Sequence, residues 1–177
     1  MTNIKILSQQ KVFKAELFDV LEVKLLEDEK TRIHHNVERR PTISVLPLTD
    51  AFEIYLVSQY RYIWKKVQLE AVAGFVEKRE SPLNAAKREL KEETGIEANH
   101  WEELSRVEIN ASVVKSLVYI FIAKDLKQTG EEIEKGIEFI KIPLEDAVKK
   151  VMTGEINTSA SMIGILLLDK LRKEKKL

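Results

Sequence analysis

The chain has 177 residues, and its 29 basic and 29 acidic residues give a formal net charge of zero. This balance provides no general attraction to nucleic acid or to an anionic membrane surface. There is no cysteine, which excludes disulfides, a thiol nucleophile and cysteine-bound zinc. No apolar run reaches membrane-spanning length, and the first residues lack the apolar segment of a secretory signal. We therefore expect a cytoplasmic protein that binds neither nucleic acid nor membrane.

The first part of the chain is predicted to be β-structure. Apolar and polar residues alternate from about residue 11 to residue 37, with an acidic interruption at 27–29. This pattern predicts a meander of antiparallel strands with a polar turn. No flexible linker follows it, so we expect residues 1–41 to form a small antiparallel β-sheet extension that docks on a main domain, 42–177.

The main domain is predicted to combine strands and helices. The expected strands are 42–48, 53–59, 67–72, 101–109, 117–123 and 136–142. The first two of these should pair through a turn at Thr49 and Asp50. Two helices are expected at the end of the chain, at 144–152 after Pro143 and at 158–173 with a cap near Asn157 or Ser159. Strands around one internal helix, with further helices at the end, favour an α/β layered sandwich.

The internal helix is predicted between Ser81 and Gly95. Ser81 is a good N-cap, and Pro82 suits the first helical position. Gly95 is a natural left-handed terminator of a helix. The residues expected to form the apolar stripe toward the core are Leu83, Ala86 and Leu90.

Three glutamates, Glu89, Glu92 and Glu93, share one edge of this helix because they lie three and four residues apart. Their like charges repel, so a cation is expected among them. Arg88 is one turn from Glu92 and also within reach of Glu80. Oxygen ligands without any nearby cysteine favour Mg²⁺ first and Mn²⁺ second. The alternative is a solvated acidic helix face, which is common in a chain that is 33% charged.

The segment 74–96 also fits a known spacing. It reads Gly-Phe-Val-Glu-Lys-Arg-Glu-Ser-Pro-Leu-Asn-Ala-Ala-Lys-Arg-Glu-Leu-Lys-Glu-Glu-Thr-Gly-Ile, in the pattern G-x5-E-x7-R-E-U-x-E-E-x-G-U, where U is a bulky aliphatic residue. Matching all the fixed identities by chance requires on the order of 10⁸ windows, at roughly 7% usage for each residue type. This pattern is the Nudix box, so the chain resembles the Nudix hydrolases. The resemblance implies an α/β/α sandwich with a mixed sheet.

Features outside the box resemble one branch of that superfamily, the ADP-ribose pyrophosphatases. Gln59-Tyr60-Arg61 follows an apolar strand, and Glu70-Ala71-Val72-Ala73-Gly74 stands where the branch typically has Glu-Leu-Pro-Ala-Gly. The likeness covers roughly residues 12–170. ADP-ribose-specific members tend to carry a proline about sixteen residues past the box, where this chain has Asn110-Ala111-Ser112-Val113. That departure leaves the choice of sugar nucleotide open.

The resemblance implies roles for particular residues. The metal ligands would be Glu89, Glu93, the Ala73 carbonyl and Glu92. The substrate contacts would be Arg61, Glu70, Arg39 and His34. A catalytic carboxylate would come from Glu131, Glu132 or Glu134, of which Glu134 is favoured because it is nearest to the following strand. Three of these substrate contacts have an alternative: Arg61 as a surface residue, Glu70 paired with Lys65 or Lys66, and His34 as an ordinary exposed residue.

The implied activity is hydrolysis of the diphosphate bond in a nucleoside diphosphate sugar. ADP-ribose is the first choice of substrate, with two monophosphates as products and two or more Mg²⁺ or Mn²⁺ ions as cofactors. The branch usually forms homodimers in which the N-terminal sheet reaches over the partner's active site. GDP-mannose, a dinucleotide or another nucleoside diphosphate derivative remain as other substrates. A non-catalytic regulator that binds sugar nucleotides is the alternative of a different class.

Overall fold

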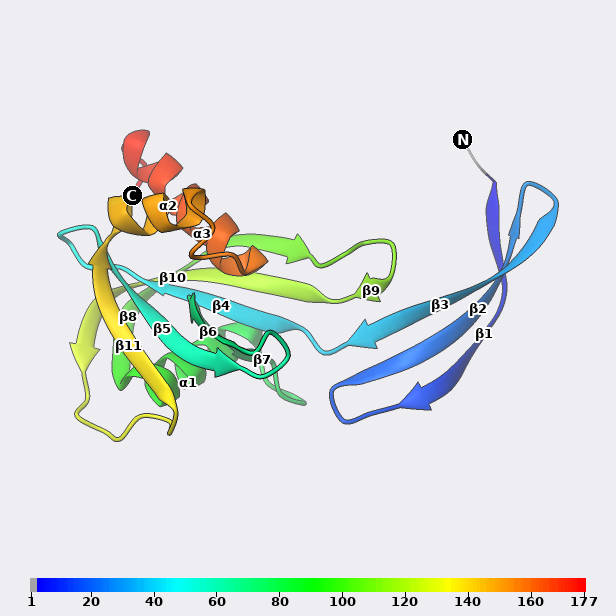
Figure 1. Cartoon of the computed structure of the whole chain (residues 1–177), viewed down its shortest axis with the longest axis horizontal. Coiled ribbons are helices and arrows are strands. Elements are labelled where there is room, and N and C mark those ends of the chain that lie inside the picture. The colour runs from blue at the N-terminus through cyan, green and yellow to red at the C-terminus, as the bar shows by residue number, and fades with distance from the viewer. Residues whose placement is uncertain (1–2) are drawn as a thin grey trace. The chain divides into compact units, whose positions relative to one another are not determined.

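The computed structural model describes residues 3–177 (Figure 1). They divide into two compact units. The first unit contains the described residues up to Pro41 together with Glu108–Leu117, and the second contains Thr42–Val107 and Val118–Leu177. Within the described part of the chain, no helix has the length and apolar character needed to cross a membrane.

The first unit is a twisted sheet with the strand order β1-β2-β3-β9. Its strands are β1 (Ile4–Lys14), β2 (Phe18–Glu27), β3 (Lys30–Arg39) and β9 (Val114–Lys115). The first three are antiparallel neighbours, which confirms the predicted meander, and β9 lies parallel to β3. Every residue of β1 is exposed, whereas β2 buries Leu21 and Val23.

The second unit contains two sheets with the strand orders β7-β4-β10-β8 and β11-β5-β6. The strands of the first sheet are β4 (Thr42–Pro47), β7 (Val72–Phe75), β8 (Ile96–Glu108) and β10 (Leu117–Gln128). Those of the second are β5 (Glu53–Arg61), β6 (Lys66–Glu70) and β11 (Ile137–Pro143). The first sheet is mixed, because β4 runs parallel to β10 and antiparallel to β7.

Helices cover both faces of these sheets (Figure 1). They are α1 (Pro82–Thr94) on one face, and α2 (Leu144–Met152) and α3 (Ser159–Lys173) on the other. Successive side chains of the central strand β4 point to opposite faces of the sheet. On one face, Ile43 packs in the core cluster that includes Leu90 of α1. Leu46 packs in the cluster that includes Ile165 of α3. The predicted α/β/α sandwich with a mixed sheet is confirmed.

Three local predictions need correction. The two strands near Thr49 do not form a pair: β4 and β5 belong to different sheets and share only the bridge between Leu48 and Ile54. The predicted strand 67–72 is two strands, β6 and β7, also in different sheets. The N-cap of α3, expected near Asn157 or Ser159, is Thr158 between them, and the Asn157 side chain accepts a hydrogen bond from Gln68 Nε2 at 3.0 Å.

The internal helix α1 follows its local signals closely. Ser81 Oγ accepts a hydrogen bond from the Asn84 N–H at 3.2 Å, and Pro82 is the first helical residue. The helix ends at Gly95, whose φ of 65° is left-handed, and the Gly95 N–H donates to the Lys91 carbonyl at 2.8 Å. The buried residues of this helix are Ala85, Ala86, Leu90, Glu93 and Thr94. The burial of Glu93 among them is the first sign of a functional site.

Candidate active site

The site begins where strand β7 runs against helix α1. Gly74 leaves room there for the side chain of Glu89. A Cβ atom built on Gly74 would lie 1.9 Å from Glu89 Oε1 and 2.0 Å from its Cδ. No residue other than glycine fits this contact without moving the carboxylate. The glycine is therefore needed to bring a helix carboxylate onto the strand backbone.

Glu93 lies one turn further along helix α1 and contacts the same strand, β7. Glu93 is 4% exposed, and its Oε2 accepts a hydrogen bond from the Ala73 N–H at 3.3 Å. Burial raises the pKa of Glu93 to about 8; the Ala73 N–H opposes this shift, and the charges of Glu89 and Glu134 add to it. Burial also raises the pKa of Glu89, against the effect of Arg88. The two carboxyl groups thus form a buried acidic site in which ionisation is disfavoured.

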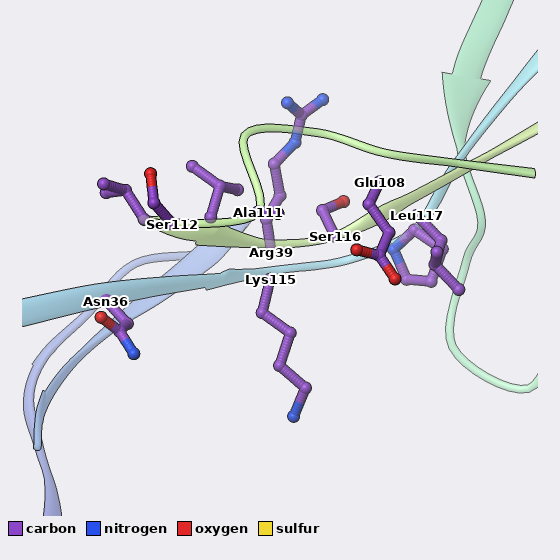
Figure 2. A pocket seen from close by; sticks show the side chains of 11 residues that line it. Asn36, Arg39, Glu108, Ala111, Ser112, Lys115, Ser116 and Leu117 are labelled. Atoms are coloured by element: carbon purple, nitrogen blue, oxygen red, sulfur yellow. The ribbon is translucent and has the colours of Figure 1, made fainter. Parts of the chain in front are cut away.

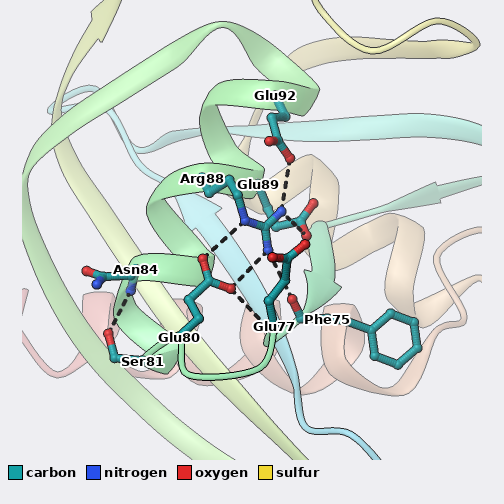
Figure 3. A network of polar contacts seen from close by, with 8 residues as sticks. All are labelled: Phe75, Glu77, Glu80, Ser81, Asn84, Arg88, Glu89 and Glu92. Atoms are coloured by element: carbon teal, nitrogen blue, oxygen red, sulfur yellow. Dashed lines mark hydrogen bonds and ion pairs between the residues drawn. The ribbon is translucent and has the colours of Figure 1, made fainter. Parts of the chain in front are cut away.

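Arg88 joins the other carboxylates of the box (Figure 3). Its Nε and Nη2 donate to the two oxygens of Glu80 at 3.1 and 3.2 Å, and Nη1 donates to Glu89 at 2.7 Å and Glu92 at 3.0 Å. Nη2 also donates to the Phe75 carbonyl at 3.1 Å. The hydrogen bond of Glu80 raises the pKa of Arg88, and that of Arg88 lowers the pKa of Glu80. One guanidinium thereby links the helix, the loop before it and the end of β7.

Glu134 is the member of its acidic loop that lies near the buried pair. Its N–H donates to the Glu92 carbonyl at 2.9 Å, and its charge raises the pKa of both Glu89 and Glu93. Glu131 instead forms an ion pair with Lys91 at 2.8 Å. Glu132 is exposed. The structure therefore brings Glu134 together with the helix carboxylates.

Arg61 and Glu70 form a two-pronged ion pair on the hairpin β5–β6. Arg61 Nε lies 2.8 Å from Glu70 Oε1, and Nη2 lies 3.1 Å from Oε2. Glu70 is 7% exposed, whereas the Arg61 side chain is 37% exposed, so only the carboxylate end of the pair is buried. The hydrogen bond to Glu70 raises the pKa of Arg61, and the charges of Glu93 and Glu134 raise it further. Arg61, not Lys65 or Lys66, is the partner of Glu70.

His34 and Arg39 belong to the first unit. His34 is exposed on β3, opposite Val23 of β2. Arg39 lines a cavity of about 580 Å³, whose other walls come from the end of β3 and from residues 108–117 (Figure 2). Burial lowers the pKa of the Arg39 guanidinium. These two predicted contacts are therefore in a different unit from the glutamates.

The donor set fits a hard divalent cation. Glu89 and Glu93 supply carboxylate oxygens beside the Ala73 backbone, and oxygen ligands of this kind suit Mg²⁺ or Mn²⁺. As the side chains lie, no cluster of three or more His, Asp or Glu residues in positions 3–177 is arranged to hold a metal. Glu89 and Glu92 instead share Arg88.

Contacts between distant parts of the chain also build this site, and no short-range pattern predicts them. The Ser161 hydroxyl accepts a hydrogen bond from the Ala71 N–H at 2.9 Å, although the two residues are 90 positions apart. Thr129 and Gln128 bind the end of α1 through the carbonyls of Gly95 and Thr94. These residues hold the backbone that carries Ala73 and Glu134.

The fold and this site define a class of protein. A family model described as the NUDIX domain matches residues 38–160, which is more than half of the chain. The chain therefore belongs to the Nudix family and is a pyrophosphatase of that family.

Particular relatives narrow the resemblance. The chain is 28% identical over 169 residues to an ADP-ribose pyrophosphatase of Bacillus subtilis (strain 168), covering 93% of this chain and 91% of the relative. It is 28% identical over 173 residues to a methanol dehydrogenase activator of Bacillus methanolicus, covering 92% and 94%. The crystal structure of an ADP compounds hydrolase has the same fold, with a TM-score of 0.83 at 24% identity over 98% of this chain and 97% of that one.

Proposed function

We propose that this pyrophosphatase hydrolyses the diphosphate bond of a nucleoside diphosphate sugar, with ADP-ribose as the first substrate and two monophosphates as products. The observation that supports the proposal is the contact of Glu89 and Glu93 with the Ala73–Gly74 backbone, with Glu134 bound to the same helix through its N–H. The similarity to an ADP-ribose pyrophosphatase over nearly the whole chain supports the choice of substrate.

The proposed cofactor is Mg²⁺ or Mn²⁺, with two or more ions. Glu89 and Glu93 are the proposed first ligands, followed by the Ala73 carbonyl and Glu92. When bound, such ions neutralise diphosphate oxygens and lower the pKa of the attacking water. Glu89 and Glu92 would bind a cation in place of Arg88. Arg88 would then remain paired with both oxygens of Glu80.

The side chains of the chain have separate proposed roles in the reaction. Glu134 holds the attacking water and accepts its proton as the oxygen–phosphorus bond forms. Arg61 binds a phosphate oxygen of the substrate, and Glu70 orients the guanidinium from the opposite side. The broken bond leaves its electron pair on the bridging oxygen, which departs with the second monophosphate.

The first unit has a proposed role in assembly and substrate cover. Its sheet exposes large apolar side chains, among them Phe13 at 55% and Ile33 at 60%. Exposed apolar patches of this kind are typical of interaction surfaces. We propose that a second copy of the chain covers them in a homodimer, and that His34 and Arg39 of one copy contact the nucleotide bound by its partner.

A matched pair of variants tests the assembly. Ile33→Lys should shift the molar mass measured by light scattering after gel filtration from that of a dimer to that of a monomer. Glu29→Lys changes the charge at an exposed turn of the same sheet and should leave the dimer intact. A monomeric wild-type protein at micromolar concentration would contradict the homodimer.

A hydrolysis screen tests the activity. Purified protein is incubated at one fixed Mg²⁺ concentration with ADP-ribose, GDP-mannose, UDP-glucose or NADH, and the monophosphate products are separated and quantified. ADP-ribose should give the highest kcat/KM, and excess EDTA should abolish turnover. Binding of a sugar nucleotide by calorimetry without turnover of any of the four would instead support the non-catalytic regulator.

The cavity around Arg39 favours a second candidate substrate class. Ala111, Ser112 and Val113 form part of its wall, at the place where ADP-ribose-specific relatives of the branch tend to carry a proline. A different wall suits a different nucleotide or sugar. Higher kcat/KM for GDP-mannose or NADH than for ADP-ribose in the same screen would support this alternative. It would not contradict the proposed metal site.

A further inference from the structure

The segment 129–136, which connects β10 to β11, is bound to the end of the helix that carries the buried carboxylates. It includes Glu134, and it leaves β10 directly after Gln128. The last carbonyls of an α-helix have no partner within the helix and must find one elsewhere. At the end of α1, this segment supplies those partners.

Thr129 makes the most extensive of these contacts. Its N–H donates to the Gly95 carbonyl at 2.8 Å, and its Oγ1 donates to the same carbonyl at 2.9 Å. The same hydroxyl oxygen accepts a hydrogen bond from the Glu131 N–H at 3.2 Å. The hydroxyl thus joins the helix end to the first turn of the segment, and both of its bonding functions are used.

Two neighbouring contacts extend this attachment. Gln128 Nε2 donates to the Thr94 carbonyl at 3.0 Å, and the Glu134 N–H donates to the Glu92 carbonyl at 2.9 Å. The second contact places the backbone of Glu134 against the turn of α1 that contains Glu93. Segment 129–136 is therefore bound to the helix both at its beginning and at Glu134.

The ion pair in the same region is a weaker attachment. Lys91 Nζ lies 2.8 Å from Glu131 Oε1 and 3.0 Å from Glu97 Oε1, but both glutamate side chains are more than half exposed. Water and salt screen exposed pairs, so such a pair holds a chain segment poorly. Thr129 is half-buried, and its hydrogen bonds are less accessible to water.

We infer that Thr129 is a positioning residue: its hydroxyl, bound to the Gly95 carbonyl, fixes segment 129–136 on the end of α1 and thereby sets the place of Glu134 beside Glu93. The inference rests on the proposed role of Glu134 as the group that holds the attacking water. Thr129 itself does not touch the reacting atoms. Its effect is on the distance between the carboxylate and the water.

The first test replaces only the hydroxyl. Thr129→Val keeps the shape of the side chain and removes its donor and acceptor. We expect kcat with ADP-ribose to fall roughly tenfold, since a misplacement of about 1 Å can cost about 10²-fold in rate. KM should stay within about twofold, because substrate binding is not affected. Thr129→Ser should restore kcat, since serine keeps the hydroxyl.

A matched control makes the same substitution at another helix end. Thr153 follows α2, and its Oγ1 donates to the Lys150 carbonyl at 3.3 Å. Thr153→Val also removes a hydroxyl from a helix C-terminus, but far along the chain from the glutamates. We expect its kcat to equal that of the wild type.

A double-mutant cycle separates a positioning role from a general structural one. If Thr129 acts through Glu134, Thr129→Val should lower kcat in the wild-type background and have no further effect in Glu134→Gln. Equal fold losses in both backgrounds would overturn the inference. An unchanged kcat in Thr129→Val, with Glu134→Gln impaired, would overturn it while leaving the proposed function intact.

Failure of the proposed role of Glu134 has its own signature. A wild-type kcat in Glu134→Gln would refute that role, and the inference about Thr129 with it. If Thr129→Val melts below the assay temperature, Gln128→Met serves in its place, because it removes one hydrogen bond of an exposed side chain. It should lower kcat about threefold, in the wild-type background only; an unchanged kcat in that variant would then overturn the inference.

Discussion

Two carboxylates at helix α1, Glu80 in the loop before it and Glu93 within it, have pKa values shifted in opposite directions. On the loop side, Glu80 meets the guanidinium of Arg88 with both oxygens, and its pKa is lowered. On the strand side, Glu93 is buried against Ala73 without a guanidinium bound to it, and its pKa is raised to about 8. Glu80, which binds the guanidinium with both oxygens, is therefore expected to serve structure, and Glu93 to bind an external cation. Glu89 is an intermediate case, because it is partly buried and also accepts a hydrogen bond from Arg88. The following predictions test this contrast.

The largest effect is expected at Glu93. Glu93→Gln keeps the size of the side chain and removes a charged ligand, so kcat should fall roughly 10²-fold or more. The fold should persist, as measured by circular dichroism and thermal melting. Glu145→Gln, at an exposed position of α2, is the matched control and should have wild-type kcat. Near wild-type turnover of Glu93→Gln at saturating Mg²⁺ would remove Glu93 from the site.

Metal binding should be visible without any substrate. A ligand at about 100 times its Kd stabilises the folded state by about 2.7 kcal/mol. Adding Mg²⁺ to chelator-treated protein should therefore raise Tm, as followed by differential scanning fluorimetry. The rise should shrink strongly in Glu93→Gln and persist in Glu145→Gln. An equal rise in both variants would place the bound ion elsewhere.

Two glycine variants should separate catalysis from packing. Gly74→Ala places a methyl group where Glu89 now lies, so we expect kcat to fall roughly tenfold as that carboxylate moves. Gly164→Ala places one 2.9 Å from Leu46 Cδ1 in the core, so it should lower Tm and leave kcat near the wild-type value. A reversed pattern in these assays would contradict the assignment of Glu89.

The loop side of the helix should show a stability effect. Glu80→Gln weakens one two-pronged contact of Arg88, so urea denaturation should show a loss of about 1 kcal/mol in the free energy of unfolding. The loss in kcat should be smaller than for Glu93→Gln. If Glu80→Gln impaired kcat as much as Glu93→Gln, the division of roles between the two sides would be wrong.

The smallest effect is expected at Lys91. Lys91→Met removes an exposed ion pair that solvent screens, so Tm should not change measurably at physiological salt. A large fall in Tm would show that Glu131 contributes more to holding segment 129–136 than its exposure indicates.

Local signals were enough to predict α1, because the residues that begin and end it act on their own neighbours in the chain. Ser81 caps it, Pro82 starts it and Gly95 ends it, as the sequence predicted. Sheet partners were harder to predict. The pairing of β4 with β10 joins segments far apart in the sequence, whereas the turn at Thr49 favoured a pairing of neighbours. Consecutive strands are usually neighbours in a sheet, so a local pattern favours the wrong partner where a strand pairs with a distant segment.

The same limit applied to the candidate site. Arg61 and Glu70 were both predicted to contact substrate, but their mutual ion pair depends on the register of the β5–β6 hairpin. Among the three glutamates of one loop, the sequence favoured Glu134 only because it is nearest to the following strand. The hydrogen bond from its N–H to α1 and the ion pair of Glu131 with Lys91 come from the folded chain. The spacing of the box was enough to predict that Glu89 and Glu93 lie together, since a helix fixes the distance between its own side chains.

The short strand β9 has a practical consequence for shortening the chain. Val37 of β3 donates its N–H to the Val113 carbonyl at 2.8 Å, and Ser116 Oγ donates to the Arg40 carbonyl at 3.1 Å. Removing the first 41 residues would deprive residues 108–117 of these partners. The segment between β8 and β10 would then expose unpaired backbone groups that favour aggregation. A trimmed version that expresses well should therefore replace that stretch with a tight hairpin turn when the N-terminal strands are deleted.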